Sequence, residues 1–367
     1  MKRILPSETE NKISASLEGA LTPTVVEALL AWYRVHHRPL PWRETRDPYR
    51  IWISEIMLQQ TRVEAVKPYF ARFLAAAPDP AALAAMEEAR LYKLWEGLGY
   101  YSRARNLQRA AREIVERHEG VMPRTYEALR ALPGIGDYTA GAIASIAYDL
   151  RVPAVDGNVL RVLSRLLACG EDISRDATKK AFAAALSPVV PPDAGDFTQS
   201  LIELGATVCV PNGEARCDVC PLAAVCRARA EGKVSDYPVK GEKRPRRIEK
   251  KTVLLVRDGK RMLLGKRPER GLLARLYELP NVEGHLSPEE AQDYVRTLGL
   301  EPVRITRAED AKHIFTHIEW HMIAYDVTVS SEFDAFIPTE RLFLADRAAW
   351  EESYAIPSAF SAYTRYL

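Results

Sequence analysis

The fold of the N-terminal half of this chain is decided by LPGIGDYTA, residues 132–140. The pattern predicts a short helix over 125–131 and a second helix that starts near Asp137, with a tight turn between them. Gly134 and Gly136 let the turn approach a ligand closely, and free N–H groups at the second helix suit one backbone phosphate of a nucleic acid. We therefore predict a helix-hairpin-helix turn; the alternative is a corner between helices that serves packing alone.

The chain is expected to fold as two domains around this motif. Residues 23–235 have apolar side chains at helical spacing almost throughout, which predicts an all-α domain preceded by an N-terminal tail at 1–22. The stretch 236–251 loses this period and gathers charge, as exposed linkers do. In 252–367, two apolar runs flank Asp258-Gly259, a typical β-hairpin signal. This second domain is predicted to be α+β.

Local signals place several elements within these domains. Asp47 and Pro48 are typical of a helix start, and Thr61 with Glu64 is typical of a capping box. The stretch HIFTHIEWHMIAYDVTV at 313–329 predicts one long strand. Ser287 with the proline and acidic residues behind it predicts a helix between the strands of the second domain.

The overall composition excludes several classes of protein. Among 367 residues, 51 Lys and Arg face 49 Asp and Glu, so the net charge is only +2 and any basic surface must be local. No stretch approaches the roughly 20 apolar residues of a membrane span, and the first residues lack the apolar segment of a signal peptide. We expect a cytoplasmic protein with no membrane partner.

Two acidic residues are candidates for chemistry. Glu55 lies in a predicted helix among bulky apolar residues, so its carboxyl should be hard to ionise. Asp156 precedes a strongly amphipathic helix and is a natural N-cap, where the helix N-terminus stabilises a carboxylate. One protonated and one ionised carboxyl form the pair that glycosidic bond cleavage requires. The alternative is a solvated Glu55 and an Asp156 that only caps its helix.

The cysteines point to a metal. Four of them form the pattern C-x7-C-x2-C-x5-C: Cys209, Cys217, Cys220 and Cys226. The fifth, Cys169, lies outside this cluster. Zinc modules usually show two short Cys or His pairs. One short pair with longer gaps and no nearby His suits a 4Fe-4S cluster better. We favour a structural cluster that holds the loop 209–226 together over one that transfers electrons.

The sequence resembles the helix-hairpin-helix DNA glycosylases of the endonuclease III superfamily. The resemblance rests on three motifs in their order: LPGIGxxTA, then PAVDGN at 153–158, then the four-cysteine loop. Within that superfamily the chain is more similar to the adenine DNA glycosylases, the MutY family, on four further motifs: LPWR (40–43), SEIMLQQTRVE (54–64), WEGLGYYSRARNL (95–107) and LIELGA (201–206). The resemblance implies a helix-hairpin-helix glycosylase domain with a 4Fe-4S loop, followed by a Nudix-like domain that recognises a lesion. The second domain lacks the Nudix metal-binding run, so it is expected not to hydrolyse.

The resemblance also implies roles in the reaction. Glu55 is expected to protonate adenine at N7 and later to assist water, and Asp156 to stabilise the sugar cation. Tyr138 and Asn158 would support them. Extrusion of the base is required, since a stacked adenine cannot reach the acid. The residues implied to line the pocket for the extruded adenine are Arg43 and Gln199.

Further residues are implied to meet the DNA and the facing 8-oxoguanine. A tyrosine such as Tyr100 is suited to wedge into a base step. The lesion-reading Phe-Ser-His element of the family matches residues 315–317, with Thr in place of Ser. The residues implied to contact the lesion or the DNA are Gln60, Thr61, Leu98, Tyr100, Thr316 and His317, together with Gly134 and Gly136 for the phosphate.

The sequence thus predicts a monofunctional adenine DNA glycosylase of base excision repair. It would excise adenine opposite 8-oxoguanine, and more weakly opposite guanine, in duplex DNA, acting as a nucleoid-associated bacterial monomer. Family members that also cut the strand carry a Schiff-base lysine where this chain has Tyr138, and a phenol cannot form that imine. Tyr138 and the second domain therefore disfavour an endonuclease III-like lyase acting on oxidised pyrimidines. A non-catalytic Fe-S protein that binds DNA is disfavoured by Glu55 and Asp156.

Overall fold

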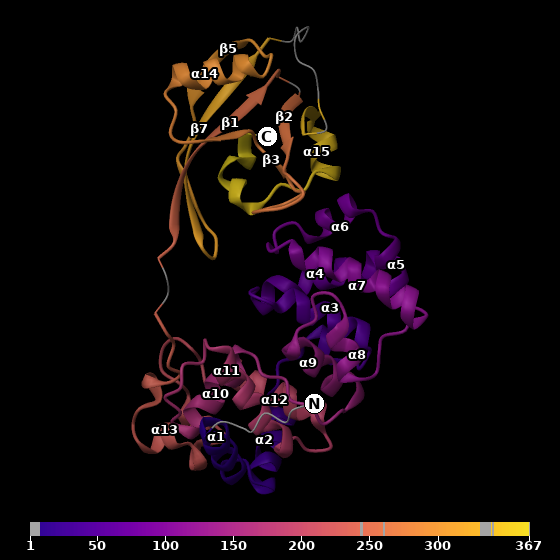
Figure 1. The fold of residues 1–367 in the computed structure, drawn as a ribbon, viewed down its shortest axis with the longest axis vertical. Coiled ribbons are helices and arrows are strands. Elements are labelled where there is room, and N and C mark those ends of the chain that lie inside the picture. Colours follow the sequence, from indigo (N-terminus) through magenta and orange to yellow (C-terminus); the bar gives the residue numbers. More distant parts are fainter. Residues whose placement is uncertain (1–7, 243–244, 260, 331–338, 340, 367) are drawn as a thin grey trace. The chain divides into compact units, whose positions relative to one another are not determined.

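The computed structural model describes residues 8–242, 245–259, 261–330, 339 and 341–366, and the chain divides into two compact units (Figure 1). The helical unit comprises residues 1–85 and 106–242, and the sheet unit comprises residues 86–105 and 243–367. Parts of the expected tail, linker and second domain, namely 1–7, 243–244, 260, 331–338, 340 and 367, lie outside the described residues. Within the described ranges, no helix combines the length and apolar character needed to cross a bilayer.

The helical unit is built from α-helices of 4 to 17 residues. In chain order they are α1 Glu8–Ala20, α2 Pro23–His36, α3 Pro48–Leu58, α4 Val63–Ala76, α5 Pro80–Ala85, α7 Ser102–His118, α8 Tyr126–Ala131, α9 Asp137–Tyr148, α10 Gly157–Leu167, α11 Asp176–Leu186, α12 Ala194–Thr207 and α13 Arg227–Ala230. The helix α7 begins within the sheet unit and continues into the helical unit.

One apolar core joins α1, α2, α10, α11 and α12. Leu17, Leu163 and Phe182 are fully buried in it. The segment expected as a tail at 1–22 therefore differs from the prediction, since it contributes α1 to this core. The physical reason is the spacing of Ile13 and Leu17, which puts two apolar side chains on one face of a helix.

The hairpin motif has the predicted form. Thr125 caps α8 by accepting a hydrogen bond from the Ala128 N–H, and α9 begins directly after Gly136. Gly134 adopts a φ of 78°, and a Cβ at this position would lie 2.6 Å from the Asn106 Cβ. Only glycine meets both constraints, because L-residues rarely adopt this backbone and have no room here.

Helix starts follow the local signals in part. Asp47 caps α3 as predicted, with its side chain accepting hydrogen bonds from Tyr49 N and Arg50 N. The capping box predicted from Thr61 and Glu64 is wrong. The helix α4 starts after Arg62 with no side-chain cap, because the Thr61 hydroxyl donates backward to the Gln59 carbonyl at 3.5 Å.

The sheet unit contains a mixed sheet with helices beside it (Figure 1). Its strand order is β3-β2-β1-β7-β5, with β4 on β1, β6 on β7 and β8 on β2. The elements are α6 Glu88–Trp95, β1 Arg247–Arg257, β2 Arg261–Lys266, β3 Tyr277–Glu278, β4 Asn281–Glu283, α14 Pro288–Thr297, β5 Pro302–Arg307, β6 Ala311–Ile314, β7 Ile318–Val329, β8 Leu342–Asp346 and α15 Arg347–Ser353. The predicted arrangement, an all-α domain followed by an α+β domain, is confirmed.

Two strand boundaries differ from the expectations. The strand β1 begins at Arg247, inside the stretch expected as a linker, because it pairs in parallel with β7 from Ile318 onward. The single strand predicted over 313–329 is a hairpin, in which β6 and β7 pair antiparallel around a turn at 315–317. The β1–β2 hairpin predicted at Asp258-Gly259 is confirmed, with Arg257 opposite Met262.

The segment 86–105 belongs to the sheet unit through specific contacts. Glu88 of α6 forms an ion pair of 2.9 Å with Arg275, and Glu96 accepts a hydrogen bond of 2.9 Å from the Ile356 N–H. A stretch from the N-terminal half of the sequence is therefore an integral part of this unit.

Candidate active site

A single open cavity of about 1250 Å³ in the helical unit collects most of the residues that the sequence singled out. Its walls come from α3, α9, α11, α12 and the segments that precede α3 and α10. The predicted residues that line it are Arg43, Glu55, Gln60, Thr61, Gly134, Gly136, Tyr138, Asp156, Asn158 and Gln199. Sequence positions more than 150 residues apart therefore meet at one hollow.

Glu55 is the buried acid of this cavity. Its side chain lies on α3 and is 8% exposed, and Oε2 accepts a hydrogen bond of 2.7 Å from the Tyr138 hydroxyl. Burial raises the pKa of Glu55 to about 7, against the Tyr138 hydrogen bond and the charge on Arg43, which lower it; the charge on Asp156 adds to the rise. Glu55 is therefore much harder to ionise than an exposed glutamate, as the sequence predicts.

Asp156 is the second carboxyl, and it caps α10. Its Oδ1 accepts a hydrogen bond of 2.8 Å from the Val159 N–H, and its Oδ2 accepts one of 2.7 Å from the Asn158 amide. Burial raises the pKa of Asp156, and these hydrogen bonds oppose the rise. The direction differs from what the cap position alone predicts, because the loss of hydration outweighs the helix N-terminus.

Close backbone packing sets the position of Asp156 and Asn158. A Cβ on Gly141 of α9 would lie 2.2 Å from the Pro153 carbonyl oxygen, just before Asp156. A Cβ on Gly205 of α12 would lie 2.6 Å from the Asn158 Cβ. Two glycines thus allow α9 and α12 to approach residues 153–158 closely.

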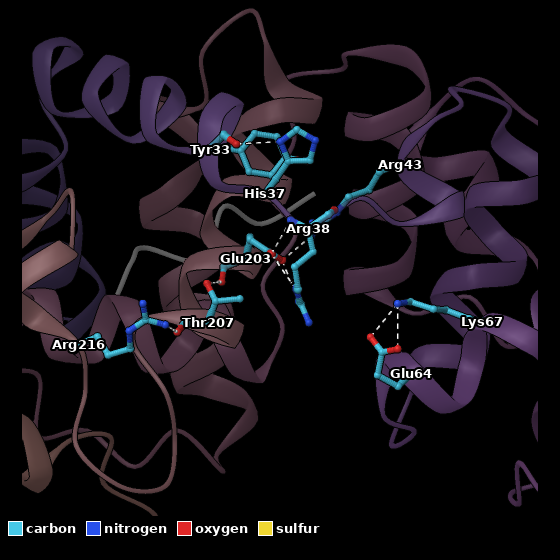
Figure 2. A network of polar contacts seen from close by, with 9 residues as sticks. All are labelled: Tyr33, His37, Arg38, Arg43, Glu64, Lys67, Glu203, Thr207 and Arg216. Carbon is cyan, nitrogen blue, oxygen red and sulfur yellow. Dashed lines mark hydrogen bonds and ion pairs between the residues drawn. The ribbon is translucent and has the colours of Figure 1, made fainter.

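The sequence did not single out Glu203, which organises one wall of the cavity. Figure 2 shows Arg38 and Arg43 converging on this carboxylate. Arg43 Nη2 donates to Glu203 at 2.7 Å, and Arg38 Nε donates at 2.7 Å. Burial alone would raise the pKa of Glu203, but the hydrogen bonds from Arg38 and Arg43 lower it to about 2. A signal existed, since an acidic residue interrupts the apolar run of LIELGA.

Two lysines at the cavity were also missed. Lys179 and Lys180 of α11 line it together with the Gly134 and Gly136 turn. Lys179 forms an ion pair of 2.9 Å with Asp176. Adjacent lysines on a polar helix face carry little signal in a sequence, because solvated faces usually look the same.

The residues implied to read the lesion belong to the sheet unit. Tyr100 is 48% exposed, and its hydroxyl lies 3.1 Å from the Thr316 hydroxyl oxygen. Thr316 and His317 are exposed in the turn between β6 and β7. Leu98, by contrast, is buried with 6% exposure. The structure therefore brings Tyr100 together with Thr316 and leaves the Leu98 side chain in the interior.

The four clustered cysteines surround one small hollow of about 30 Å³ in the helical unit: Cys209, Cys217, Cys220 and Cys226. Among the residues described, no three His, Cys, Asp or Glu side chains are arranged to hold a single metal ion. A multi-iron cluster binds its thiolates through different irons, so its ligands surround a hollow instead of meeting at a point. Arg165 Nη1 lies 3.3 Å from Cys209 Sγ and can offset thiolate charge. The donor set fits such a cluster.

Comparison with known proteins gives matches over both units. Residues 53–188 match the HhH-GPD superfamily of base excision DNA repair proteins, and residues 252–365 match the NUDIX domain. The adenine DNA glycosylase of Mus musculus is 36% identical over 88% of this chain and 73% of its own length. That of Buchnera aphidicola (subspecies Baizongia pistaciae) is 31% identical over 80% of this chain and 82% of its own. A solved thermostable thymine-DNA glycosylase is 26% identical with a TM-score of 0.52, covering 61% of this chain and all of that one.

Proposed function

Because this chain belongs to the adenine DNA glycosylase family, we propose that it removes adenine mispaired with 8-oxoguanine, or with guanine, from duplex DNA. The reaction leaves an abasic site for base excision repair. The observation that carries the proposal is the shared cavity in which Glu55 keeps a proton while Asp156 lies at the start of α10.

The geometry supports a stepwise hydrolysis. With adenine turned out of the duplex into the cavity, Glu55 gives its proton to N7 of the base. The bond from the sugar to N9 then breaks, its electron pair stays with the base, and a positive charge develops on the deoxyribose. Asp156 stabilises that cation, with Asn158 and the Val159 N–H holding the carboxylate in place. Water adds to the sugar, and its proton passes to Glu55, which restores the acid.

Tyr138 supports a glycosylase without lyase activity. Its hydroxyl donates to Glu55 at 2.7 Å and thereby orients the acid. A lyase needs an amine at this point to form a Schiff base with the sugar, and a phenol cannot supply one. The product is therefore expected to be an intact strand with an abasic site. Arg43 and Gln199 line the same cavity and would lie beside the extruded base.

Lesion recognition is assigned to the sheet unit and to the rim of the cavity. Tyr100, Thr316 and His317 would meet the facing 8-oxoguanine, with Leu98 supporting the Tyr100 turn from the interior. Gln60 and Thr61 would occupy the space that adenine leaves. The turn at Gly134 and Gly136 would bind a DNA phosphate through its N–H groups.

We also propose that Cys209, Cys217, Cys220 and Cys226 hold a 4Fe-4S cluster. Such a cluster would cross-link and stabilise this irregular loop through its thiolate ligands, and no step of the hydrolysis uses it. Arg165 would hold the loop on α10, since its guanidinium also donates to the Val210 carbonyl at 2.9 Å.

A single-turnover assay on duplexes with adenine opposite 8-oxoguanine tests the function, with and without alkali treatment. Strand cleavage that appears only after alkali supports a monofunctional glycosylase. Cleavage without alkali would indicate a lyase, and no base release would indicate a DNA-binding protein. Glu55→Gln should abolish base release and still bind the mismatch tightly; near-normal turnover by this variant would remove Glu55 from its role.

A further inference from the structure

Arg103 is a buried arginine that the hydrolysis does not use. It lies in the first turn of α7, and the residue is 8% exposed. Burial lowers the pKa of Arg103 to about 10, so its guanidinium is still charged at neutral pH although it has lost most of its hydration. A buried charge needs polar or aromatic partners in place of the lost water.

Such partners lie in the segment directly before α7. Arg103 Nη2 donates to the Leu98 carbonyl at 2.9 Å and to the Gly99 carbonyl at 3.0 Å. The guanidinium carbon lies 5.2 Å from the centre of the Trp95 ring and 5.8 Å from the centre of the Tyr100 ring. Both distances are within the range of cation–π attraction. Arg103 thus contacts the Tyr100 ring and the two carbonyls that precede this residue.

Tyr100 has a backbone conformation that needs support. Its φ of 47° lies in the left-handed region, which is strained for a residue with a side chain. The turn before it also passes through this region, with a φ of 96° at Gly97 and 68° at Gly99. The Tyr100 carbonyl accepts a hydrogen bond of 2.9 Å from the Arg103 N–H. Arg103 therefore donates to the carbonyls of consecutive residues, 98–100, in a strained turn.

The support matters because the Tyr100 ring is 48% exposed at the surface that the proposed function assigns to the lesion. We propose that Arg103 is a positioning residue that fixes the Tyr100 ring before DNA binds, so that the ring enters the base step beside 8-oxoguanine in an already ordered conformation. This inference rests on the proposed function. Ordering a side chain and its loop during binding weakens the complex, and a conformation fixed in advance avoids that loss.

The test compares single-turnover rates, normalised to active sites, on adenine opposite 8-oxoguanine and on adenine opposite guanine. Arg103→Met keeps much of the length of the side chain and removes the guanidinium. It should narrow the ratio of the two rates by about three- to tenfold. The matched control is Arg117→Met, the same change on α7 at an arginine that is 71% exposed, and it should leave the ratio unchanged. A mere loss of stability or active fraction affects both substrates equally and does not move the ratio.

A double-mutant cycle asks whether Arg103 acts through Tyr100. Tyr100→Ala removes the ring that Arg103 is proposed to hold, so it should narrow the ratio by itself. Adding Arg103→Met to Tyr100→Ala should then change the ratio by less than about twofold. If Arg103→Met narrows the ratio by the same factor with and without the Tyr100 ring, Arg103 acts independently of Tyr100 and the inference is wrong.

Arg103→Lys covers the case in which Arg103→Met does not fold. It keeps a positive charge near the rings and lacks the planar guanidinium that reaches both carbonyls, so it should narrow the ratio by less than Arg103→Met. A wild-type ratio in every folded Arg103 variant would overturn the inference while the proposed function stands. If the wild type itself releases no adenine from either mispair, the proposed function fails, and the inference fails with it.

Discussion

Three charged or polar neighbours tune the acid at position 55. Burial alone raises the pKa of Glu55, the Tyr138 hydroxyl and the Arg43 charge lower it, and Asp156 raises it, with a result of about 7. Because the proposed reaction needs the protonated form of Glu55, base release should fall as pH rises through about 7. A single pH-rate profile reports this balance.

Tyr138→Phe should move that fall in activity to higher pH. The substitution removes the hydrogen bond of 2.7 Å that lowers the pKa of Glu55, and it adds no charge. Tyr148→Phe at the other end of α9 is the control, since its hydroxyl donates to the Met122 carbonyl and not to Glu55. The measurement is kcat against pH for each variant. A shift to lower pH in Tyr138→Phe would contradict the proposed hydrogen bond.

Single residues differ in how far the sequence reveals them. Glu55 and Asp156 could be predicted as site residues because each lies in a local sequence pattern. Glu55 lies on an apolar helix face, and Asp156 lies at a helix start. Glu203 gave only the weak signal of an acidic residue in an apolar run, because its partners Arg43 and Arg38 lie 160 and 165 positions away. The raised pKa of Asp156 could not be predicted from the sequence either. The helix cap is a local feature, but the burial that outweighs it depends on the tertiary fold.

Among the secondary-structure elements, the contact of α9 with the segment before α10 sets the site. Gly141→Ala should lower the free energy of unfolding by about 1–3 kcal/mol, because a Cβ there would lie 2.2 Å from the Pro153 carbonyl oxygen. Gly19→Ala in α1 is the matched control, with nothing within 4 Å of the added Cβ. It should be neutral or stabilise by up to about 1 kcal/mol.

Denaturant unfolding of both variants checks this prediction. Gly141→Ala should also slow adenine release, because a displaced Pro153 carbonyl moves Asp156 at the start of α10. An equal stability of the two alanine variants would show that α9 can shift without cost.

The cysteine loop allows a test of metal binding. Cys220→Ser should lose bound iron and at least about 2 kcal/mol of stability, as removal of a structural metal site does. Cys169→Ser is the control, since Cys169 does not line the hollow of the four cysteines. Iron content per chain and thermal unfolding are the measurements. Full iron content in Cys220→Ser would exclude this residue as a ligand.

Element boundaries were predictable where the signal is local. Asp47 and Asp258-Gly259 mark a helix start and a hairpin by their own chemistry, and both are observed. The turn at 315–317 has no Gly, Pro, Asn or Asp, so nothing in Phe315-Thr316-His317 announces it. The pairing of β6 with β7 creates that turn, and pairing is a property of two strands together.

At the scale of the full chain, the sheet unit joins two distant stretches at Tyr100 and Thr316. Thr316→Ala should reduce the preference for adenine opposite 8-oxoguanine over adenine opposite guanine, because it removes both a hydroxyl and the 3.1 Å contact that steadies Tyr100. Thr364→Ala, another exposed threonine of the same unit, is the control. The measurement is the ratio of single-turnover rates on the two mispairs. A ratio unchanged from the wild type would contradict the proposed lesion recognition.

The division of the chain into units was the least predictable level. The sequence correctly indicates an all-α and an α+β domain from their hydrophobic periods. It contains no local sign that residues 86–105 belong with the second of these, since the decisive contacts, such as Glu88 with Arg275, join positions 187 apart. Periodicity reports which face of a helix is buried and not which partner buries it.

The sheet unit is built from two separate stretches, residues 86–105 and 243–367, and this has a consequence for biosynthesis. The segment 86–105 leaves the ribosome before the strands that complete its unit, and at roughly 5–20 residues per second the wait is on the order of ten seconds. During that interval Glu88 and Glu96 lack Arg275 and the Ile356 N–H, their partners in the finished fold. Nascent chains that stall before residue 243 should therefore contain α6 without these contacts, and full-length synthesis should supply them.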